Sequence, residues 1–262
     1  MTSRFKYLAI GGGVVVVLAI AAVVGVWWFL RDDAPDEVSL ESAVDAVGAD
    51  SADGTTDGEP TDDADGGVAT GGSSFDGDIA GTWTVDTESG DFDYESATGT
   101  FVGFRIEEEL SSIGSTTAVG RTGDVTGSMT IEGTTLTAAN FEVDMTTITT
   151  NESRRDDNVY RALDTDQFPT GSFVLTEPVD LGADAADGGA VSITAVGDLT
   201  LHGVTKAVEF PLEAELVDGT IVVVGSLDIV FADYDVEVPT APIVVSVEDH
   251  GPIELQLLLT ES

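Results

Sequence analysis

The feature that most constrains the fold is a hairpin pattern at residues 190–213, which read AVSITAVGDLTLHGVTKAVEFPLE. Apolar residues alternate with polar ones on both sides of a short turn segment, L-H-G-V-T-K, which runs from Leu201 to Lys206. The alternating apolar residues are Val191, Ile193 and Ala195 before the turn and Val208, Phe210 and Leu212 after it. A period of two is typical of strands with one buried face. The pattern predicts two antiparallel strands joined by a tight turn.

The same alternation recurs through most of the chain after residue 80, in short runs separated by turn signals. The runs include Trp83 with Val85, Val125 with Met129 and Ile131, Phe141 with Val143 and Met145, Phe173 with Leu175, Ile221 to Val224, and Ile253, Leu255, Leu257 and Leu259. Turns are expected at Glu132-Gly133, Asp187-Gly188-Gly189, Asp218-Gly219 and His250-Gly251-Pro252. Many short strands at such spacing indicate an antiparallel barrel or sandwich.

One segment of this region departs from strand alternation. Residues 153–163 read SRRDDNVYRAL, in which Val159 and Leu163 have the i, i+4 spacing of one helical face, and Asn151 precedes them as a plausible cap. We expect one short helix that plugs or flanks the barrel.

The N-terminus contains a long apolar segment. Residues 7–30 carry no charge, and a helix of this length crosses a hydrocarbon core of about 30 Å. Arg4 and Lys6 precede the segment, so the positive-inside rule predicts a cytoplasmic N-terminus at residues 1–6 and an extracytoplasmic remainder. The alternative is a cleaved signal peptide, although the end of the segment (WWFLRDD) has no small-x-small site. Either interpretation predicts export.

Residues 31–80 have the composition of a flexible linker. They are rich in acidic residues, Gly, Ser, Thr and Ala, and Phe75 is their one aromatic residue. Leu40, Val44 and Val47 have helical spacing, which indicates at most a transient helix. The expected domains are therefore residues 1–6, a span at 7–30, a disordered acidic linker at 31–80 and a β domain at 81–262.

Composition excludes several classes of function. The formal net charge of -40, from 49 acidic and 9 basic residues, would repel nucleic acid phosphates. The absence of cysteine excludes thiolate catalysis and thiolate metal ligands, and two histidines are too few for a multi-histidine metal site. We expect no metal and no cofactor.

Five segments in the β domain resemble the YceI-like family. They are G-T-W-T-V-D at 81–86, N-E-S-R-R-D-D-N at 151–158, D-x-F-P-x-x-S-F at 166–173, G-D-L-T-L-H-G-V-T-K at 197–206, and V-F-A-D-Y-D at 230–235 together with V-E-D-H-G at 247–251. Their common order over residues 81–262 identifies the chain as a family member, similar to a membrane-anchored subgroup. The resemblance implies a lipocalin-like antiparallel barrel of about eight strands that holds a polyisoprenoid lipid and is not an enzyme.

Aromatic and methionine side chains on different strands are the candidates for lining such a lumen. They are Trp83, Phe101, Phe104, Met129, Phe141, Met145, Phe173, Phe210 and Phe231. A tube lined in this way could take up a flexible apolar tail by burial of apolar surface. The competing interpretation is that these side chains fill a closed core, which would leave a surface-display or adhesion module with no ligand.

Cationic side chains are scarce after residue 80, and three of the six lie in the expected helix. Arg154 and Arg155 are candidates for binding a polar head group such as a phosphate, because guanidinium groups form bidentate bonds with phosphate oxygens. Alternatively, they neutralise Asp156, Asp157 and the acidic surroundings.

An enzyme acting on a lipid would require His202 or His250 beside an acid in a pocket. Both histidines fall in expected turns, where a hydrogen-bonding role is the simpler interpretation. The sequence thus predicts extracytoplasmic binding, storage or transport of a long-chain isoprenoid, such as a prenyl quinone or prenyl phosphate, in a membrane-tethered barrel. It does not indicate an oligomeric state.

Overall fold

A computed structural model of the chain describes residues 34–53, 79–95, 97–111, 114–238 and 244–262. The segments at 1–6 and 7–30 that we expect to be cytoplasmic and membrane-spanning lie outside these residues. Among the described residues, no helix is long and apolar enough to cross a membrane.

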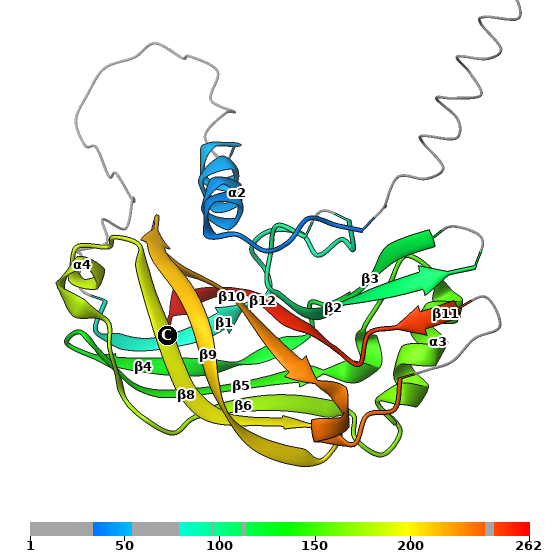
Figure 1. Ribbon diagram of the computed structural model, residues 1–262. Coiled ribbons are helices and arrows are strands. Elements are labelled where there is room, and N and C mark those ends of the chain that lie inside the picture. Colours follow the sequence, from blue (N-terminus) through cyan, green and yellow to red (C-terminus); the bar gives the residue numbers. More distant parts are fainter. Residues whose placement is uncertain (1–33, 54–78, 96, 112–113, 239–243) are drawn as a thin grey trace, which may run out of the picture.

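Eight antiparallel strands close into a barrel (Figure 1). In spatial order these strands are β1 (Gly81–Asp86), β4 (Val125–Glu132), β5 (Thr135–Asp144), β6 (Thr170–Leu175), β8 (Val191–Leu201), β9 (Val204–Val217), β10 (Thr220–Val230) and β12 (His250–Glu261). The pairing of Val85 with Leu259 brings β1 beside β12 and completes the ring. The expected fold, an all-β antiparallel barrel of about eight strands, is confirmed.

Four further strands extend the sheet beyond the ring. β2 (Phe101–Leu110) pairs with the first half of β12, and β3 (Gly114–Thr122) and β11 (Val244–Val247) pair with β2. The two-residue strand β7 (Val179–Asp180) pairs with β5. The extension continues the barrel wall on one side and deepens its interior at that end.

The hairpin predicted from residues 190–213 is β8 and β9. Leu201 pairs with Val204, so His202 and Gly203 alone form the loop. Both have positive φ, 49° and 75°, as a two-residue hairpin turn of the type I′ class requires. A Cβ at Gly203 would also lie 2.5 Å from the Phe168 ring. The expected turn at Asp218-Gly219 is confirmed in the same way, with φ values of 50° and 84°.

The expected turn at His250-Gly251-Pro252 is wrong. His250 begins β12 and pairs with Val230, and Pro252 pairs with Asp228. Tertiary pairing along the full length of β10 overrides the local Gly-Pro signal. Similarly, Met145 does not continue β5 but begins a short 3-10 helix, η1 (Met145–Thr147).

The predicted helix is confirmed as α3 (Ser153–Ala162), which lies with β11 at one end of the barrel (Figure 1). Its N-cap is Glu152 rather than Asn151. Asn151 instead accepts a hydrogen bond from the Arg155 guanidinium. Two elements were not expected: α4 (Gly182–Ala186), at the opposite end, and a second 3-10 helix, η2 (Phe231–Tyr234).

Part of the expected flexible linker is an ordered element of the domain. Residues 34–39 cross the outer wall of the barrel and lead into α2 (Leu40–Asp53) (Figure 1). Ala43 is only 1% exposed and packs against Val222, Val224 and Leu258, which point outward from β10 and β12. The expectation of disorder is therefore wrong for this segment, because the barrel supplies an apolar surface that composition does not reveal. Residues 54–78 of the linker lie outside the described residues.

Candidate functional site: the barrel cavity

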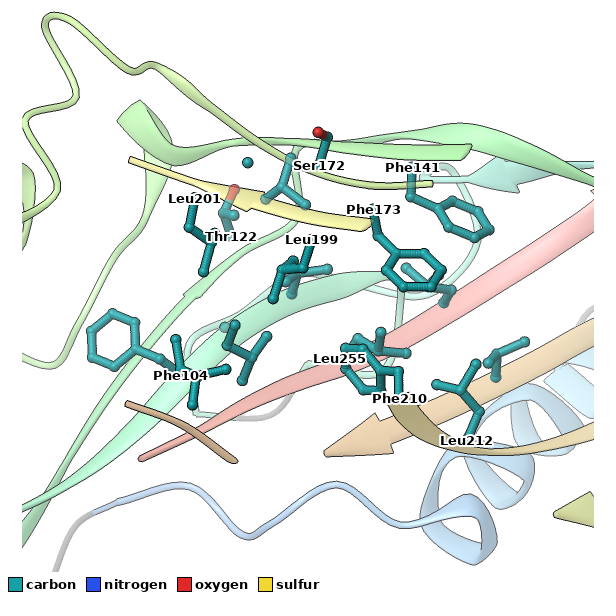
Figure 2. A pocket seen from close by; sticks show the side chains of 18 of the residues that line it. Phe104, Thr122, Phe141, Ser172, Phe173, Leu199, Leu201, Phe210, Leu212 and Leu255 are labelled. Carbon is teal, nitrogen blue, oxygen red and sulfur yellow. The ribbon is translucent and has the colours of Figure 1, made fainter. Parts of the chain in front are cut away.

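The interior of the barrel encloses a cavity of about 680 Å³. Inward-facing side chains of β2, β4, β5, β6, β8, β9, β10 and β12 line it, and Figure 2 shows several of them. On β12, for example, Ile253, Leu255 and Leu257 line the cavity while the residues between them face outward. The volume lies within the range of about 300–1,000 Å³ that is usual for small-molecule sites.

Three phenylalanines gather on one side of the cavity (Figure 2). Phe141 pairs with Phe173 across β5 and β6, and the Phe173 ring meets the Phe210 ring edge to face, with centroids 6.2 Å apart. Gly197 makes room for the Phe173 ring, because a Cβ at this position would lie 2.5 Å from the ring carbon Cζ. The β8–β9 hairpin therefore leaves a gap in the wall at Gly197, which the Phe173 side chain fills.

The end of the cavity beside α4 is closed by a packed apolar core. Trp83 and Leu259 are fully buried there, and Ile79 and Ala185, which line the cavity at this end, are 4% and 7% exposed. The Trp83 indole Nε1 donates a hydrogen bond to the Ile79 carbonyl oxygen at 2.9 Å. This end of the barrel is closed by its own buried side chains.

The opposite end, beside α3, carries a group of polar side chains. Its lining residues include Glu108, Glu152, Arg154, Arg155 and Asn158. The Arg155 guanidinium donates to the Glu108 carboxylate at 2.5 Å, and these two side chains are 24% and 10% exposed. We refer to this α3 end as the mouth of the cavity.

Arg154 differs from the other cations of the described structure. Arg105, Arg121, Arg155, Arg161 and Lys206 each have a carboxylate, amide or carbonyl partner. Arg154 is exposed at the mouth and has neither an ion pair nor a hydrogen bond with any described residue. Of the two arginines proposed from sequence for a head group, only Arg154 is therefore available in this structure.

Seven of the nine expected lumen residues line the cavity: Phe104, Met129, Phe141, Met145, Phe173, Phe210 and Phe231. Whether any of them contacts a ligand stays a prediction. Trp83 and Phe101 do not line it, which corrects the expectation for these two positions. Trp83 belongs to the packed closed end. Phe101 faces the outer wall, where the Arg121 guanidinium lies 4.5 Å from the centre of its ring, because the inward positions of β2 are Val102, Phe104 and Ile106.

Aliphatic side chains make up most of the lining, and the emphasis on aromatic residues missed them. Leu199 and Leu201 on β8, Leu212 on β9 and Leu255 on β12 are examples (Figure 2). The alternation that predicts the strands also identifies these positions, because each continues the apolar parity of its own strand: Leu199 and Leu201 follow Ile193 and Ala195, Leu212 follows Phe210, and Leu255 follows Ile253.

Neither histidine lies in the cavity. His202 lies at the hairpin turn, where Nδ1 is 3.1 Å from the Tyr234 carbonyl oxygen and the ring stacks edge to face on Phe168. His250 is exposed, and a hydrogen bond with the Asp249 carboxylate raises the pKa of its imidazole. Glu248, Asp249 and His250 form an exposed group with ligand atoms within 4.8 Å of one another, which is common on acidic surfaces.

Comparison with known proteins identifies relatives of the β domain. A UPF0312 protein of Pseudomonas putida strain W619 is 32% identical over 109 residues, which are 40% of this chain and 53% of that protein. The corresponding protein of strain GB-1 is 31% identical over the same lengths. The chain thus spans about half the length of the curated relatives it matches.

Comparison with solved structures identifies one domain with the same fold. A domain from Saccharophagus degradans, described as polyisoprenoid-binding and implicated in plant cell wall breakdown, superposes with a TM-score of 0.52 at 18% identity. The superposition covers 70% of this chain and 99% of that domain. BcnA of Burkholderia cenocepacia gives 0.48 at 16% identity, over 61% and 94% of the two chains.

A family-level match covers most of the chain. Residues 83–259 match the YceI-like domain, from the first barrel strand to the last. The match begins two residues after the start of the closed barrel at Gly81 and ends two residues before its end at Glu261. The chain therefore belongs to the YceI-like family.

Proposed function

We propose that the barrel binds a long-chain isoprenoid lipid, such as a prenyl quinone or a prenyl phosphate, and stores or transports it outside the cytoplasm. The observation that carries the proposal is the apolar cavity of about 680 Å³ inside a barrel that is closed at one end. The Saccharophagus degradans domain with the same fold is described as polyisoprenoid-binding, which supports the same class of ligand here.

The chemistry of the cavity suits a ligand that has a long apolar tail and a polar end. Its inner part is lined by aliphatic and aromatic side chains, whose contact with an isoprenoid would be favoured by about 25 cal/mol for each Å² of apolar surface removed from water. The mouth offers the Arg154 guanidinium, a suitable partner for a phosphate or a quinone oxygen. We infer that the tail enters first and the head group stays at the mouth.

Location outside the cytoplasm is part of the proposal and depends on residues 7–30. Their uncharged apolar sequence and the preceding Arg4 and Lys6 support an uncleaved anchor with the barrel on the outer side. The partners would then be the isoprenoid and the membrane that supplies it. We expect no nucleic acid partner and no enzyme activity.

Two neighbouring alanines of β5 provide a matched test of the cavity. Ala139 faces the cavity and is 7% exposed, whereas Ala138 points outward and is exposed. Native mass spectrometry of the full chain, purified gently from its own membranes, would measure bound lipid, and organic extraction would give its mass. We expect a discrete isoprenoid on the wild type and on Ala138→Phe, and its loss on Ala139→Phe without loss of folding, because the new ring occupies empty volume.

The opposite results favour the filled-core alternative. If the wild type has the mass of the bare chain and takes up neither a prenyl quinone nor a prenyl phosphate, the barrel does not bind isoprenoids. If Ala139→Phe is destabilised by about 1–3 kcal/mol relative to Ala138→Phe, the interior is overpacked and has no free volume. Either result would favour a surface-display or adhesion module.

A further inference from the structure

The outer wall of the barrel is buried where solvent would be expected. On β12 the outward side chains of Glu254, Gln256 and Leu258 are 2%, 5% and 1% exposed. The backbone at Thr98 and Gly99 covers Gln256, whose Nε2 donates to the Gly99 carbonyl oxygen at 2.8 Å. Residues 34–53 cover the rest. An outer wall that is this deeply buried is part of an internal interface.

The first half of this interface is polar. Glu254 accepts from Arg105 Nε at 3.3 Å, and its second oxygen lies 3.9 Å from Arg121 Nη2. The two guanidinium groups also hold the chain above them: Arg105 Nη2 donates to the Pro35 carbonyl oxygen at 2.8 Å, and Arg121 Nη2 donates to the Asp36 carbonyl oxygen at 2.9 Å. Buried charges need such partners, and the covering segment supplies one to each guanidinium group, although Arg121 Nε has no hydrogen-bond partner in the described structure.

The second half is apolar and lies farther along the same segment. Ala43 of α2 packs on Val222, Val224 and Leu258, and Leu40, Val44 and Val47 surround the contact. Residues 34–47 are therefore attached at two places, first to β2 and β3 and then to β9, β10 and β12 (Figure 1). We call residues 34–47 the strap.

The strap has a direction with respect to the cavity. Its first attachment point, Arg105, lies three residues from Glu108, which pairs with Arg155 at the mouth. Three strand residues span about 10 Å. Its second attachment includes Val217 and Leu258, near the closed end of the barrel. The N-terminal end of the strap is thus on the mouth side of the molecule.

The docked strap changes the length of the tether. A flexible linker of 50 residues would separate a barrel from its anchor by about 35–40 Å on average. With the strap attached at Pro35, only residues 31–34 separate this attachment from the apolar segment that ends at Leu30. Four residues span at most about 14 Å.

We propose that the strap holds the mouth of the cavity toward the membrane surface at short range. This inference rests on the membrane anchor of the proposed function and adds the orientation of the barrel to it. The partner is the bilayer itself, the source of the apolar ligand. A chain with a net charge of -40 would otherwise be repelled from anionic lipid, so a short attachment counteracts that repulsion.

Single fluorescent labels test the orientation, since the chain has no cysteine of its own. Ser153→Cys places a donor at the mouth and Asp187→Cys places one at the closed end, both at exposed positions. The full chain is reconstituted into phosphatidylcholine vesicles that carry an acceptor on a small fraction of their head groups. We expect stronger energy transfer from position 153 than from position 187.

Two insertions distinguish the effect of the strap from that of the rest of the linker. Twenty Gly/Ser residues between Asp33 and Ala34 add about 25 Å of reach before the strap, and we expect them to abolish the difference between the two labels. The same insertion after Gly66 lies beyond the strap and should leave the difference unchanged. Both insertions leave the barrel sequence intact, so both proteins are expected to fold.

Each result has a distinct meaning. The orientation is contradicted if energy transfer from positions 153 and 187 is equal in the original chain, or if the two insertions have equal effects. Neither result would contradict the anchor or the lipid site. Failure of the full chain to float with the vesicles would contradict the anchor, and the orientation with it. Lipid binding by the cavity is measured separately by mass spectrometry and does not depend on either result.

Discussion

The two faces of β12 are both buried, but for different reasons. On the inner face, Ile253, Leu255 and Leu257 border a cavity. On the outer face, Glu254, Gln256 and Leu258 are covered by the strap and the segment before β2, and Glu254 and Gln256 have polar partners. Low exposure alone therefore does not identify a ligand site. The distinguishing features are the free volume and the absence of polar partners on the inner face within the described structure.

This contrast separates two kinds of mutational effect. Changes on the outer face remove contacts that exist in the folded protein, so they should lower the free energy of unfolding and leave lipid binding intact. Changes on the inner face alter a surface that borders free volume, so they should affect binding more than stability.

The largest expected effect is the loss of the charge at Glu254. Glu254→Gln keeps the shape of the side chain but leaves the partly buried Arg105 and the buried Arg121 without their carboxylate partner, which should lower the free energy of unfolding by about 3–5 kcal/mol. Denaturant titration measures the change. Asp233→Asn, which breaks the exposed 3.1 Å pair with Lys206, is the control and should cost at most about 1 kcal/mol. Equal losses in the two variants would mean that the outer cluster contributes no more than a surface ion pair.

A charge beneath the strap should have the next largest effect. Ala43→Glu places a carboxylate among Val222, Val224 and Leu258, so α2 should detach at a cost of about 1–3 kcal/mol. Limited proteolysis should then cleave within residues 34–53, whereas the amount of co-purified lipid should stay unchanged. Ser42→Glu adds the same charge at an exposed position of the same helix and serves as the control. Loss of lipid from Ala43→Glu alone would show that the two faces are coupled.

A smaller and selective effect is expected at the mouth. Arg154→Gln removes the exposed, unpaired guanidinium, and should weaken the binding of a prenyl phosphate about two- to tenfold with little change in the binding of a prenyl quinone. Titration of each lipid at low and high salt measures both affinities, and the difference should shrink as salt screens the charge. Arg161→Gln is the control, because its guanidinium bonds to Asp157 and Asn158 and does not line the cavity. An equal loss for both lipids would mean that the guanidinium binds a phosphate no better than a quinone oxygen.

Strand alternation in the sequence predicted the barrel and the parity of most lining positions. It did not distinguish lining from packing, because residues of one parity can border free volume, as Phe141 does, or pack against other side chains at the closed end, as Trp83 does. It also did not show which parity of β2 faces inward, which is why Phe101 was misplaced. Both properties depend on how distant strands meet.

The strap was missed for a related reason. Its apolar positions, Leu40, Val44 and Val47, are visible in the sequence, but they stand among acidic and small residues that are typical of a coil. Their stability comes from Val222, Val224 and Leu258, more than 150 residues away in the chain. The outward apolar positions of β10 and β12 were the available signal, since a solvent-facing strand surface would not be expected to carry them.

The smallest expected effect concerns the segment that covers Gln256, and it depends on pH. Partial burial raises the pKa of the Asp86 carboxyl, but hydrogen bonds from the Ser89 hydroxyl at 2.6 Å and from the backbone N–H groups of Glu88 and Ser89 outweigh it, so the net pKa lies below the ordinary value. A depressed pKa in the folded state stabilises the protein above the unfolded pKa of about 3.9, and this stabilisation is lost as the pH falls through the folded value. Because solvent screens a partly exposed carboxylate, Asp86→Asn should cost only a few tenths of a kcal/mol at pH 7.

Unfolding measurements on the wild type and Asp86→Asn at pH 7 and pH 3 would test this sign. The difference in the free energy of unfolding between the two proteins should be smaller at pH 3 than at pH 7, because the wild-type carboxyl takes up its proton as the pH falls. Glu132→Gln removes the same charge at the exposed last residue of β4, which has no side-chain hydrogen bond in the described structure, and it corrects for the general effect of one charge fewer. A larger difference in the free energy of unfolding at pH 3 than at pH 7 would contradict a lowered pKa of Asp86 in the folded protein. The expected result would show that the outer face is held at its edge by a charge, whereas the inner face is shaped by apolar side chains around free volume.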